Sequence, residues 1–396
     1  MKKTRLILAP GKDKAVLRRH PWIFSGAVKC VDGKAQEGDL VDVVDFHGNW
    51  LATGHFQNDT ITCKVLSFDT PEVDENFFRQ RLASAIAYRE RLGFFNPQDG
   101  GTNVFRLVHA EGDYLPGLVC DWYNGVLVMQ AHSVGMHNLF PLFVKLFQEL
   151  LGERLVSIFD KSSSTLSLET SDGYLWGKEP LEWEICENGV RMLINFFEGQ
   201  KTGFFIDQRE NRKLVQELTR GHRVLNCFGY TGGFSLAALR GGAEYVETVD
   251  ISRKAIDLCK RNVELNFPGC SNHQGTVADV LQYLSEFRIH NPKFDFIILD
   301  PPAFAKNHRS LQQGLKGYRS INQRAMEALP SGGFLMTFSC SQAVSKDDFQ
   351  TMVFTSAMNA HRNVRIVRQL PHAMDHPVSI HHPEGEYLKG LLLQVE

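Results

Sequence analysis

From residue 223 to residue 359 short apolar runs alternate with longer amphipathic runs, and this alternation limits the fold more than any other feature. The apolar runs predict strands at 223–228, 245–250, 294–300 and 332–339, and the amphipathic runs predict helices between and after them. Strands that alternate with helices are typical of a parallel sheet covered by helices on both faces. The sequence therefore predicts an α/β, doubly wound, Rossmann-like domain in this part of the chain.

The residues before this domain show two other patterns. Residues 1–72 combine short alternating runs with frequent glycines, which predicts a small β-barrel. Residues 73–180 contain a helix-like run at 77–92, an Asn124-Gly125 hairpin signal and a helix-like run at 136–151, which predicts an α+β domain. We therefore expect three domains: a barrel (1–72), a central domain (73–180) and the doubly wound domain (181–396).

The overall composition excludes little. The net charge of −2 gives no support to a nucleic-acid binder, although local basic stretches at 12–20 and 306–319 can attract phosphate. The eight cysteines contain no CxxC pair, and the histidines at 372–382 lie in a Pro- and Gly-containing loop, so no metal site is expected. We expect a cytoplasmic protein with no membrane partner, because the N-terminal apolar run is too short for a signal and no apolar run spans a membrane.

In a doubly wound sheet, ligands bind where the strands end, so the residues after each predicted strand are candidates for a site. The first strand leads into a glycine turn at Asn226–Gly233 that matches neither GxGxxG nor a phosphate loop. The second ends in Asp250, about 20 residues after the turn, where an acid can accept hydrogen bonds from ribose hydroxyls. Asp279 closes a short third run, residues 276–279, and either contacts a base or caps the next helix. Asp250 could likewise be a cap, but Ser252 is better placed for that.

The fourth strand ends in Asp300-Pro301-Pro302-Ala303-Phe304. Two consecutive prolines can neither continue a hydrogen-bonded strand nor form a regular helix turn. They predict a rigid loop with an acid at its base, and a purely structural need for that arrangement is hard to identify.

These motifs together resemble the class I S-adenosylmethionine-dependent methyltransferases, which implies a seven-stranded, mostly parallel sheet and S-adenosylmethionine as cofactor. The resemblance covers the glycine turn, the acids at Asp250 and Asp279, the Asp-Pro-Pro loop and the preceding segment Gln200–Arg209. The cofactor contacts that it implies are Phe228, Tyr230, Gly232, Asp250, Ile251, Asp279 and Gln208.

Cys340, at the end of the fifth strand, indicates which atom is methylated. Carbon 5 of cytosine is a poor nucleophile until a thiolate adds to carbon 6, so such enzymes need a cysteine in the same crevice. Cys340 then acts as the nucleophile and Asp300 orients the base, whereas Cys227 is expected to be a buried structural residue. The alternative for Cys340 is also a buried structural role. Pro301, Pro302 and Phe304 are the expected substrate contacts, and Phe304, Tyr318 or Phe204 could stack on the flipped base.

With both the Asp-Pro-Pro loop and Cys340 present, the chain resembles the bacterial 23S ribosomal RNA cytosine-5 methyltransferases of the RlmI type over nearly its whole length. This resemblance implies an N-terminal PUA domain that binds RNA, ribosomal RNA of the large subunit as partner, and 5-methylcytosine as product. His20-Pro21-Trp22 then lies on the RNA side or forms a packing corner. The wider RNA cytosine-5 family often has a second cysteine where Ala303 and Phe304 stand, so water or Asp300 must take the carbon 5 proton.

Two other functions remain open from the sequence. Asp-Pro-Pro loops also serve enzymes that methylate exocyclic amines of guanine or adenine, for which Cys340 would only be packing. A non-catalytic RNA-binding factor of ribosome assembly is the third option, and the intact acids and Cys340 argue against it. The sequence does not determine the oligomeric state, for which a homodimer is one option.

Overall fold

The computed structural model describes residues 4–96, 101–166, 170–285, 293–305 and 307–396. These residues form two compact units. Unit 1 comprises Met1–Ile185, Ile194–Ile206 and Met374–Gly385, and unit 2 comprises Cys186–Leu193, Asp207–Ala373 and Glu386–Glu396. The predicted barrel and central domain thus fall in one unit, and the domain boundaries at 72/73 and 180/181 remain predictions. Within the described part of the chain, no helix is both long and apolar enough to cross a membrane.

Unit 2 is built on a seven-stranded sheet in the order β16-β15-β14-β17-β18-β20-β19. Its strands are β14 (Arg223–Cys227), β15 (Tyr245–Asp250), β16 (His273–Val277), β17 (Phe296–Leu299), β18 (Gly333–Ser339), β19 (Val364–Gln369) and β20 (Lys389–Val395). β20 runs antiparallel to both of its neighbours, and the other described pairings are parallel. The strand order reverses at β14, which is the switch point where ligands bind in such sheets. The predicted α/β fold with a mostly parallel seven-stranded sheet is confirmed.

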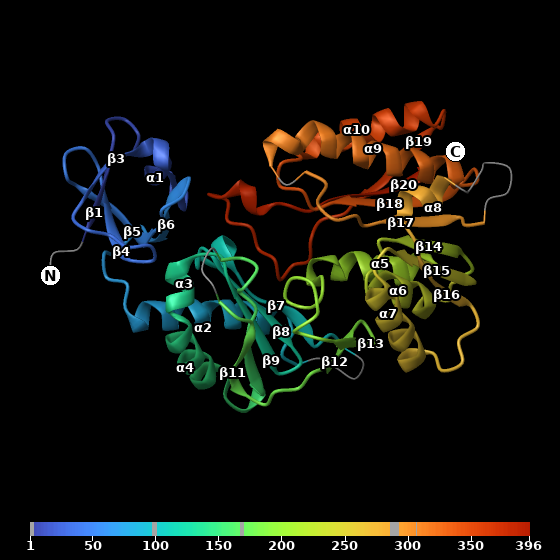
Figure 1. The fold of residues 1–396 in the computed structure, drawn as a ribbon, viewed down its shortest axis with the longest axis horizontal. Coiled ribbons are helices and arrows are strands. Elements are labelled where there is room, and N and C mark those ends of the chain that lie inside the picture. The colour runs from blue at the N-terminus through green and yellow to red at the C-terminus, as the bar shows by residue number, and fades with distance from the viewer. Residues whose placement is uncertain (1–3, 97–100, 167–169, 286–292, 306) are drawn as a thin grey trace. The chain divides into compact units, whose positions relative to one another are not determined.

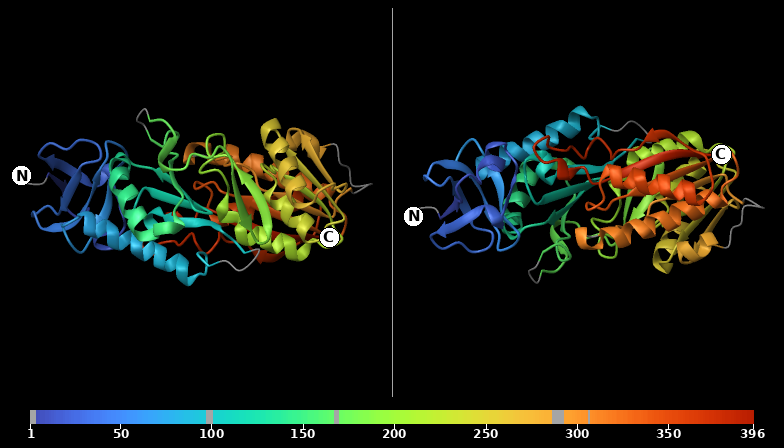
Figure 2. Two further views of the ribbon diagram at one scale, coloured as in Figure 1. Left: turned by 90° about the horizontal axis from the view of Figure 1, so that it is seen from below. Right: turned by 90° about the horizontal axis from the view of Figure 1, so that it is seen from above.

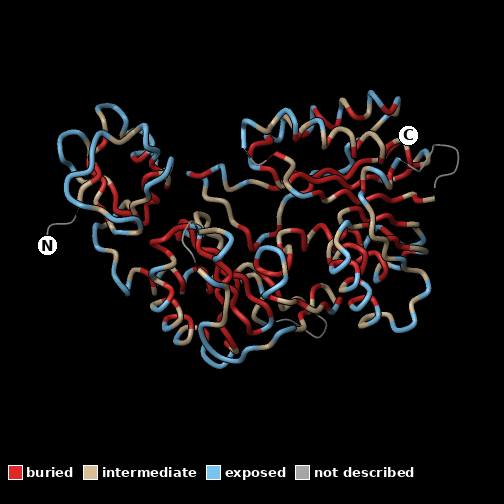
Figure 3. The backbone as a smooth tube through the Cα atoms, in the orientation of Figure 1, coloured by how far each residue is buried: buried red, intermediate tan, exposed pale blue. Residues whose placement is uncertain are grey.

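The helices that the structure describes around this sheet are α5 (Arg209–Leu218), α6 (Gly233–Arg240), α7 (Arg253–Asn266), α8 (Val280–Ser285), α9 (Leu311–Ala328) and α10 (Lys346–Asn359). Figure 1 shows α5, α6 and α7 on one face and α9 and α10 on the other. The inner strands β15, β14, β17, β18 and β20 are almost fully buried (Figure 3), whereas the edge strands β16 and β19 are mostly partly buried or exposed. Because both faces are covered, the polar groups of the site can gather only where the strands end.

The first part of unit 1 is a six-stranded sheet in the order β2-β6-β5-β4-β1-β3. Its elements are β1 (Arg5–Leu8), α1 (Lys14–Leu17), β2 (Trp22–Phe24), β3 (Val28–Asp32), β4 (Leu40–Val44), β5 (Trp50–Phe56) and β6 (Ile61–Ser67). Leu6, Leu8, Val41 and Val43 alternate with more exposed residues and form its core, as a sheet with one buried face requires. This is the small all-β region that the sequence predicts, and we call it the N-terminal sheet.

The second part of unit 1 is a five-stranded sheet in the order β11-β10-β9-β8-β7, with helices packed against it. Its elements are α2 (Glu75–Arg91), β7 (Val104–His109), β8 (Leu118–Tyr123), β9 (Val126–Ala131), α3 (Val134–Asn138), α4 (Phe140–Leu151), β10 (Ser157–Asp160) and β11 (Gly173–Gly177), visible from two sides in Figure 2. A short hairpin of β12 (Trp183–Glu187) and β13 (Val190–Ile194) follows. The Asn124-Gly125 turn joins β8 to β9 with positive φ at both residues, as predicted. The single helix predicted at 136–151 is wrong in detail, because the chain ends one helix at Asn138 and begins another at Phe140 with a proline in its first turn.

The segment Met374–Gly385 connects β19 to β20 but belongs to unit 1, where a buried arginine holds it. Arg89 has no exposed surface and donates to both carboxylate oxygens of Asp113 at 2.6 and 2.8 Å. The same guanidinium donates to the backbone carbonyls of Arg106 and Asp375 at 2.7 and 2.6 Å. A planar guanidinium with five donors suits such a junction, and its charge is matched by one buried carboxylate.

We expect Arg89→Met to lower the free energy of unfolding of unit 1 by about 3–5 kcal/mol, because it leaves Asp113 buried without a countercharge. Urea unfolding followed by tryptophan fluorescence measures this directly, since all five tryptophans lie in unit 1. Arg79→Met is the control: Arg79 pairs with Glu75 and Glu149 on the surface of α2, and its loss should cost about 1 kcal/mol or less. Equal effects of the two substitutions would contradict the assignment.

Candidate active site

The turn after β14 is shaped by three residues with positive φ, namely Phe228 (58°), Tyr230 (46°) and Gly232 (89°). A Cβ atom on Gly229 would lie 2.3 Å from the Thr248 methyl group, and one on Gly232 would lie 2.4 Å from the sulfur of Cys259. Only glycine fits at these two positions without displacing β15 or α7. The turn is thereby pressed against the neighbouring strand, with its backbone at the switch point of the sheet.

Asp250 closes β15 and fixes this turn. Its carboxylate accepts hydrogen bonds from the backbone N–H of Tyr230 at 2.9 Å and of Ser252 at 2.8 Å. Ser252, not Asp250, caps α7, because its hydroxyl accepts from the backbone N–H of Ala255. Each carboxylate oxygen keeps a second lone pair for a ligand, and the adjacent Ile251 is 73% exposed beside it.

Asp279 lies after β16 and is exposed. One of its carboxylate oxygens accepts from the backbone N–H of Gln282 at 2.9 Å, so the residue caps α8. The capping role that the sequence left open is therefore present, and the second oxygen is free of protein hydrogen bonds in the described residues.

The Asp-Pro-Pro loop follows β17 and rests on α9. Pro301 is buried, Pro302 is exposed and Phe304 is partly buried. The Phe304 ring packs against Tyr318, with ring centroids 4.7 Å apart, and against Phe228 at 6.3 Å. Gly314 and Gly317 of α9 permit this close approach, since a Cβ on Gly314 would lie 2.7 Å from that of Ala305. The contacts with α9 and Phe228 fix the loop on its buried side, and Pro302 remains at the surface.

Asp300 carries the most informative electrostatics of the site. Burial and the negative charge of Asp207 raise its pKa from 3.8 to about 7, against the opposing effects of Gln208 and Arg212. Gln208 donates to a carboxylate oxygen of Asp300 at 3.0 Å and accepts from Asn211 at 2.6 Å. Asp300 is thus divided between its acid and carboxylate forms near neutral pH, so it can donate as well as accept a hydrogen bond.

Cys340 lies directly beside this loop. It follows β18, which pairs in parallel with β17 so that Leu299 lies opposite Thr337. Its thiol is partly exposed and donates to the carbonyl of Pro301, with sulfur and oxygen 3.9 Å apart. Cys227 contrasts with it, because that thiol is fully buried and burial raises its pKa well above the usual value. Cys227 is buried as the sequence predicts, whereas the nucleophilic role of Cys340 stays a prediction.

Two charged residues beside this loop are missing from the sequence-based prediction. Asp207 is the acid whose charge acts on Asp300, and Lys389 is a lysine that opens the otherwise apolar strand β20. The Lys389 ammonium donates to the carbonyls of Ser341 and Tyr387, both at 2.6 Å, and the residue is 5% exposed. A lysine next to the apolar run Leu391–Leu393 is unusual enough to draw attention to the residue, although it does not place the residue at the site.

Two of the proposed base-stacking residues are wrong. Tyr318 has no exposed surface, and its hydroxyl is hydrogen-bonded to Ser341 at 2.8 Å, so its ring supports Phe304 from below. Phe204 is 4% exposed in unit 1. Phe304 alone of the three has a partly exposed ring.

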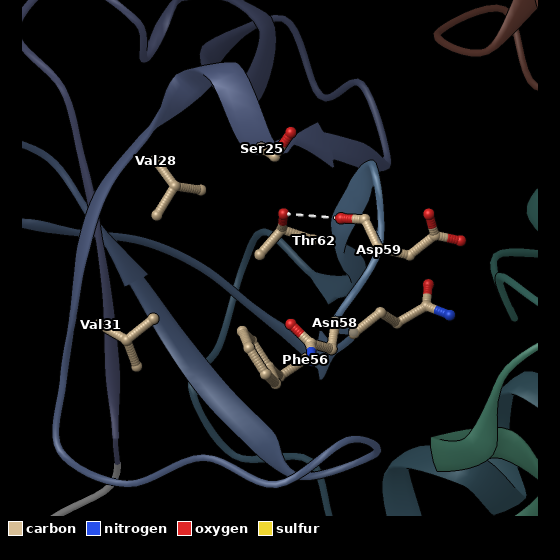
Figure 4. A pocket seen from close by; sticks show the side chains of 8 residues that line it. Ser25, Val28, Val31, Phe56, Asn58, Asp59 and Thr62 are labelled. Atoms are coloured by element: carbon tan, nitrogen blue, oxygen red, sulfur yellow. Dashed lines mark hydrogen bonds between the residues drawn. The ribbon is translucent and has the colours of Figure 1, made fainter.

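His20-Pro21-Trp22 has packing partners within unit 1. The Trp22 indole donates to Glu111 at 2.8 Å and its ring lies edge-on to His382, with centroids 4.3 Å apart. Lys12, Lys14 and Arg18 near α1 are exposed, while Lys306 of the second basic stretch lies outside the described residues. The N-terminal sheet also has a surface hollow lined by Ser25, Val28, Val31, Phe56, Gln57, Asn58, Asp59 and Thr62 (Figure 4). No basic side chain lines it, so phosphate contacts are expected elsewhere on this sheet.

Comparison with known proteins agrees with this geometry. A family model described as S-adenosylmethionine-dependent methyltransferase matches residues 161–378, and one described as PUA-like domain matches residues 6–68. The chain is 39% identical to ribosomal RNA large subunit methyltransferase I of Escherichia coli K12 over 398 residues, covering 99% of both chains. The chain belongs to this family of S-adenosylmethionine-dependent methyltransferases.

Solved structures show the same fold at lower identity. A methyltransferase solved with S-adenosylhomocysteine superposes with a TM-score of 0.85 at 22% identity, covering 98% of this chain and 99% of the other. A methyltransferase from Streptococcus mutans superposes with a TM-score of 0.84 at 21% identity, with the same coverage. The likeness extends over both units of the chain.

The residues of the site fit S-adenosylmethionine. Asp250 offers acceptors for ribose hydroxyls and Ile251 offers an exposed apolar surface for a base. Asp207 has one buried carboxylate oxygen with no hydrogen-bond partner in the described structure, which suits the ammonium group of the methionine moiety. Gln208, expected to touch the cofactor, is 2% exposed and bonded to Asp300, so its side chain is already occupied. The other expected contacts, Phe228, Tyr230, Gly232 and Asp279, lie at the ends of β14 and β16.

We expect Asp250→Asn to weaken S-adenosylmethionine binding by roughly 10- to 100-fold, because hydrogen bonds to a charged acceptor are worth about 1.5–3 kcal/mol. Titration calorimetry measures the dissociation constant. Asp257→Asn, an exposed acid on α7, is the control and should leave the affinity unchanged. An unchanged affinity in Asp250→Asn would exclude Asp250 as a cofactor ligand.

The raised pKa of Asp300 predicts a pH-dependent stability. The folded state holds its proton up to about pH 7, whereas the unfolded chain releases it near pH 3.8, so wild-type stability falls as the pH rises between these values. Asn carries no charge, so the free energy of unfolding of Asp300→Asn should not show this fall. The difference between variant and wild type should therefore grow in favour of Asp300→Asn from about pH 4 to about pH 7, by at most about 4 kcal/mol, and stay constant at higher pH.

Urea unfolding followed by far-UV circular dichroism measures this difference, because unit 2 contains no tryptophan. Asp257→Asn should show no such trend. A stability difference for Asp300→Asn that is the same at pH 5 and pH 8 would contradict the raised pKa.

Proposed function

We propose that this protein methylates carbon 5 of a cytosine in large-subunit ribosomal RNA through a covalent adduct with Cys340. The observation that supports this most is the contact of the Cys340 thiol with the Pro301 carbonyl, which brings a nucleophile and Asp300 to the same edge of the sheet. The named activity of the Escherichia coli relatives, large-subunit ribosomal RNA methylation, supports RNA as the substrate. The PUA-like match agrees with an RNA substrate, and we place this activity in the cytoplasm.

Each residue has a defined task in this mechanism. The target cytosine leaves its stack, at a cost of a few kcal/mol, and enters beside Pro302 and Phe304. The Cys340 thiolate adds to carbon 6, while Asp300 in its acid form donates to the ring nitrogen and lowers the barrier to addition. Bound S-adenosylmethionine supplies an electrophilic methyl group. A base, either the Asp300 carboxylate or water, then takes the carbon 5 proton, and the thiolate leaves.

The same residues account for the absence of a second cysteine. Ala303 and Phe304 occupy the loop positions where related RNA cytosine-5 enzymes often carry one. Asp300 has a pKa near 7, so it can act first as a donor and afterwards as an acceptor within one turnover. Because its acid and carboxylate forms are both populated near pH 7, the single carboxyl group of Asp300 can perform both tasks, proton donation to the ring and proton removal from carbon 5.

The proposal predicts a trapped intermediate. Fluorine at carbon 5 cannot leave as a proton would, so 23S ribosomal RNA transcribed with 5-fluorocytidine should remain bound to Cys340 in the presence of S-adenosylmethionine. Denaturing gel electrophoresis detects the adduct and peptide mass spectrometry locates it. Cys340→Ala should abolish it, whereas Cys270→Ser, a partly exposed cysteine of the same unit, should retain it.

Two results would overturn the proposal. One is methylation of cytosine carbon 5 by Cys340→Ala at a rate near that of wild type. The other is a product in which nucleoside mass spectrometry finds the methyl group on an exocyclic amine of guanine or adenine, which the Asp300-Pro301-Pro302 loop alone could support.

A further inference from the structure

Cys340 requires a positive charge nearby to work as a nucleophile at neutral pH. A free cysteine has a pKa of about 8.5, so only a few per cent is thiolate at pH 7, and reactive cysteines are activated by a neighbouring cation, a helix N-terminus or a metal. Cys340 follows a strand, so no helix begins at it. The proposed function therefore raises the question of which cation serves this thiol.

Lys389 is placed beside the nucleophile by the pairing of β18 with β20. It is the cross-strand partner of Ser339, the residue before Cys340. Its ammonium reaches past Cys340 to donate to the carbonyl of Ser341 at 2.6 Å. A second hydrogen bond, to the carbonyl of Tyr387 at 2.6 Å, fixes the side chain in this position. The lysine thus spans the three residues Ser339 to Ser341, with Cys340 in the middle.

The burial of Lys389 is not explained by a structural ion pair. The residue is 5% exposed, and its hydrogen bonds within the described chain go to two neutral carbonyls and to no carboxylate. Burying an ammonium group without a countercharge costs several kcal/mol. A thiolate at Cys340 would supply that countercharge, so the lysine and the nucleophile each provide what the other lacks.

The charges around this pair are consistent with a protonated lysine. Burial lowers the pKa of Lys389 from 10.5 to about 8, the negative charges of Cys340 and Glu386 oppose this, and Lys346 of α10 adds to it. The ammonium form therefore predominates at pH 7. Tyr318 of α9 also faces Cys340, but burial raises its pKa, so it is neutral there. The Cys340 thiol donates to the carbonyl of Pro301, the residue that follows Asp300.

We propose that the Lys389 ammonium is the positioning charge that holds Cys340 as a thiolate. This inference deepens the proposed function and rests on Cys340 being its nucleophile. The thiol proton passes to solvent before substrate binds, and the thiolate electron pair forms the bond to carbon 6. On product release that bond breaks and the pair returns to sulfur. Lys389 keeps its proton through both steps and stabilises the sulfur anion before and after.

The test is the pH dependence of Cys340 alkylation by iodoacetamide, measured in the full chain without RNA or cofactor. Mass spectrometry quantifies the Cys340 peptide, and only the thiolate reacts, so the rate gives the thiol pKa. Lys389→Met should raise this pKa by one unit or more. Its alkylation rate should fall about tenfold at pH 7 and reach the wild-type rate at high pH. Lys389→Arg, which keeps the charge, should stay close to wild type.

Two controls separate this effect from a loss of structure. Lys346→Met removes an exposed lysine of the same unit that pairs with Glu386, and it should leave the Cys340 profile near that of wild type. The buried Cys227 should remain unreactive in every variant, because unfolding would expose it.

An unchanged Cys340 profile in Lys389→Met would overturn the inference, and so would a shift that Lys389→Arg reproduces. The alkylation result is independent of the RNA adduct. If the thiol pKa depends on Lys389 but no RNA adduct forms, the proposed function is refuted. If the adduct forms but the thiol pKa does not depend on Lys389, only this inference is refuted. If both hold, adduct formation by Lys389→Met should be slow at pH 7 and recover towards pH 9.

Discussion

The parallel pairing of β17 with β18 is the contact on which the site depends. Leu299 lies opposite Thr337, and both strands end within a few residues of this pair, so Asp300 and Cys340 emerge at the same edge of the sheet. Side chains alternate between the two faces of a strand, so a slip by one residue would turn either side chain away from its partner. Both faces of the sheet are packed under helices, and this burial fixes the register. The chemistry of the site is therefore a consequence of core packing.

Buried charge is the second constraint, and the site is organised around it. Burial and, after it, the negative charge of Asp207 raise the pKa of Asp300 to about 7, so Asp300 holds a proton up to near neutral pH. Lys389 is a cation bound to carbonyls, beside a thiol that can become an anion. Other buried charges are matched in pairs, as Arg89 with Asp113 and Arg212 with Glu187 show. Asp300 and Lys389 both lie where strands of the sheet begin or end and both have shifted pKa values, which is typical of a functional site.

Much of this arrangement follows from local sequence. Asp250, Asp300 and Cys340 each end a strand of recognisable pattern, and in a doubly wound fold that is enough to place them near one another. Lys389 and Asp207 could not be placed in this way. Lys389 reaches the site only because β20 inserts antiparallel between β18 and β19, a pairing between distant residues that no local pattern encodes. The prediction that Tyr318 stacks on the base is wrong for a related reason, because its hydroxyl is hydrogen-bonded to Ser341 and to the backbone of Phe304 inside the core.

The placement of Lys389 also bears on how the enzyme releases its product without a second cysteine. In the proposed mechanism the thiolate is the attacking group at the start and the leaving group at the end. A charge that lowers the pKa of the thiol raises the fraction present as thiolate and makes the sulfur a better leaving group. The nucleophilicity of the thiolate falls as well, but only slightly, because it depends weakly on the thiol pKa. One fixed ammonium therefore assists addition and elimination alike. A family member with Ala303 and Phe304 in its loop can accordingly complete the cycle with Asp300 and Lys389 on either side of a single cysteine.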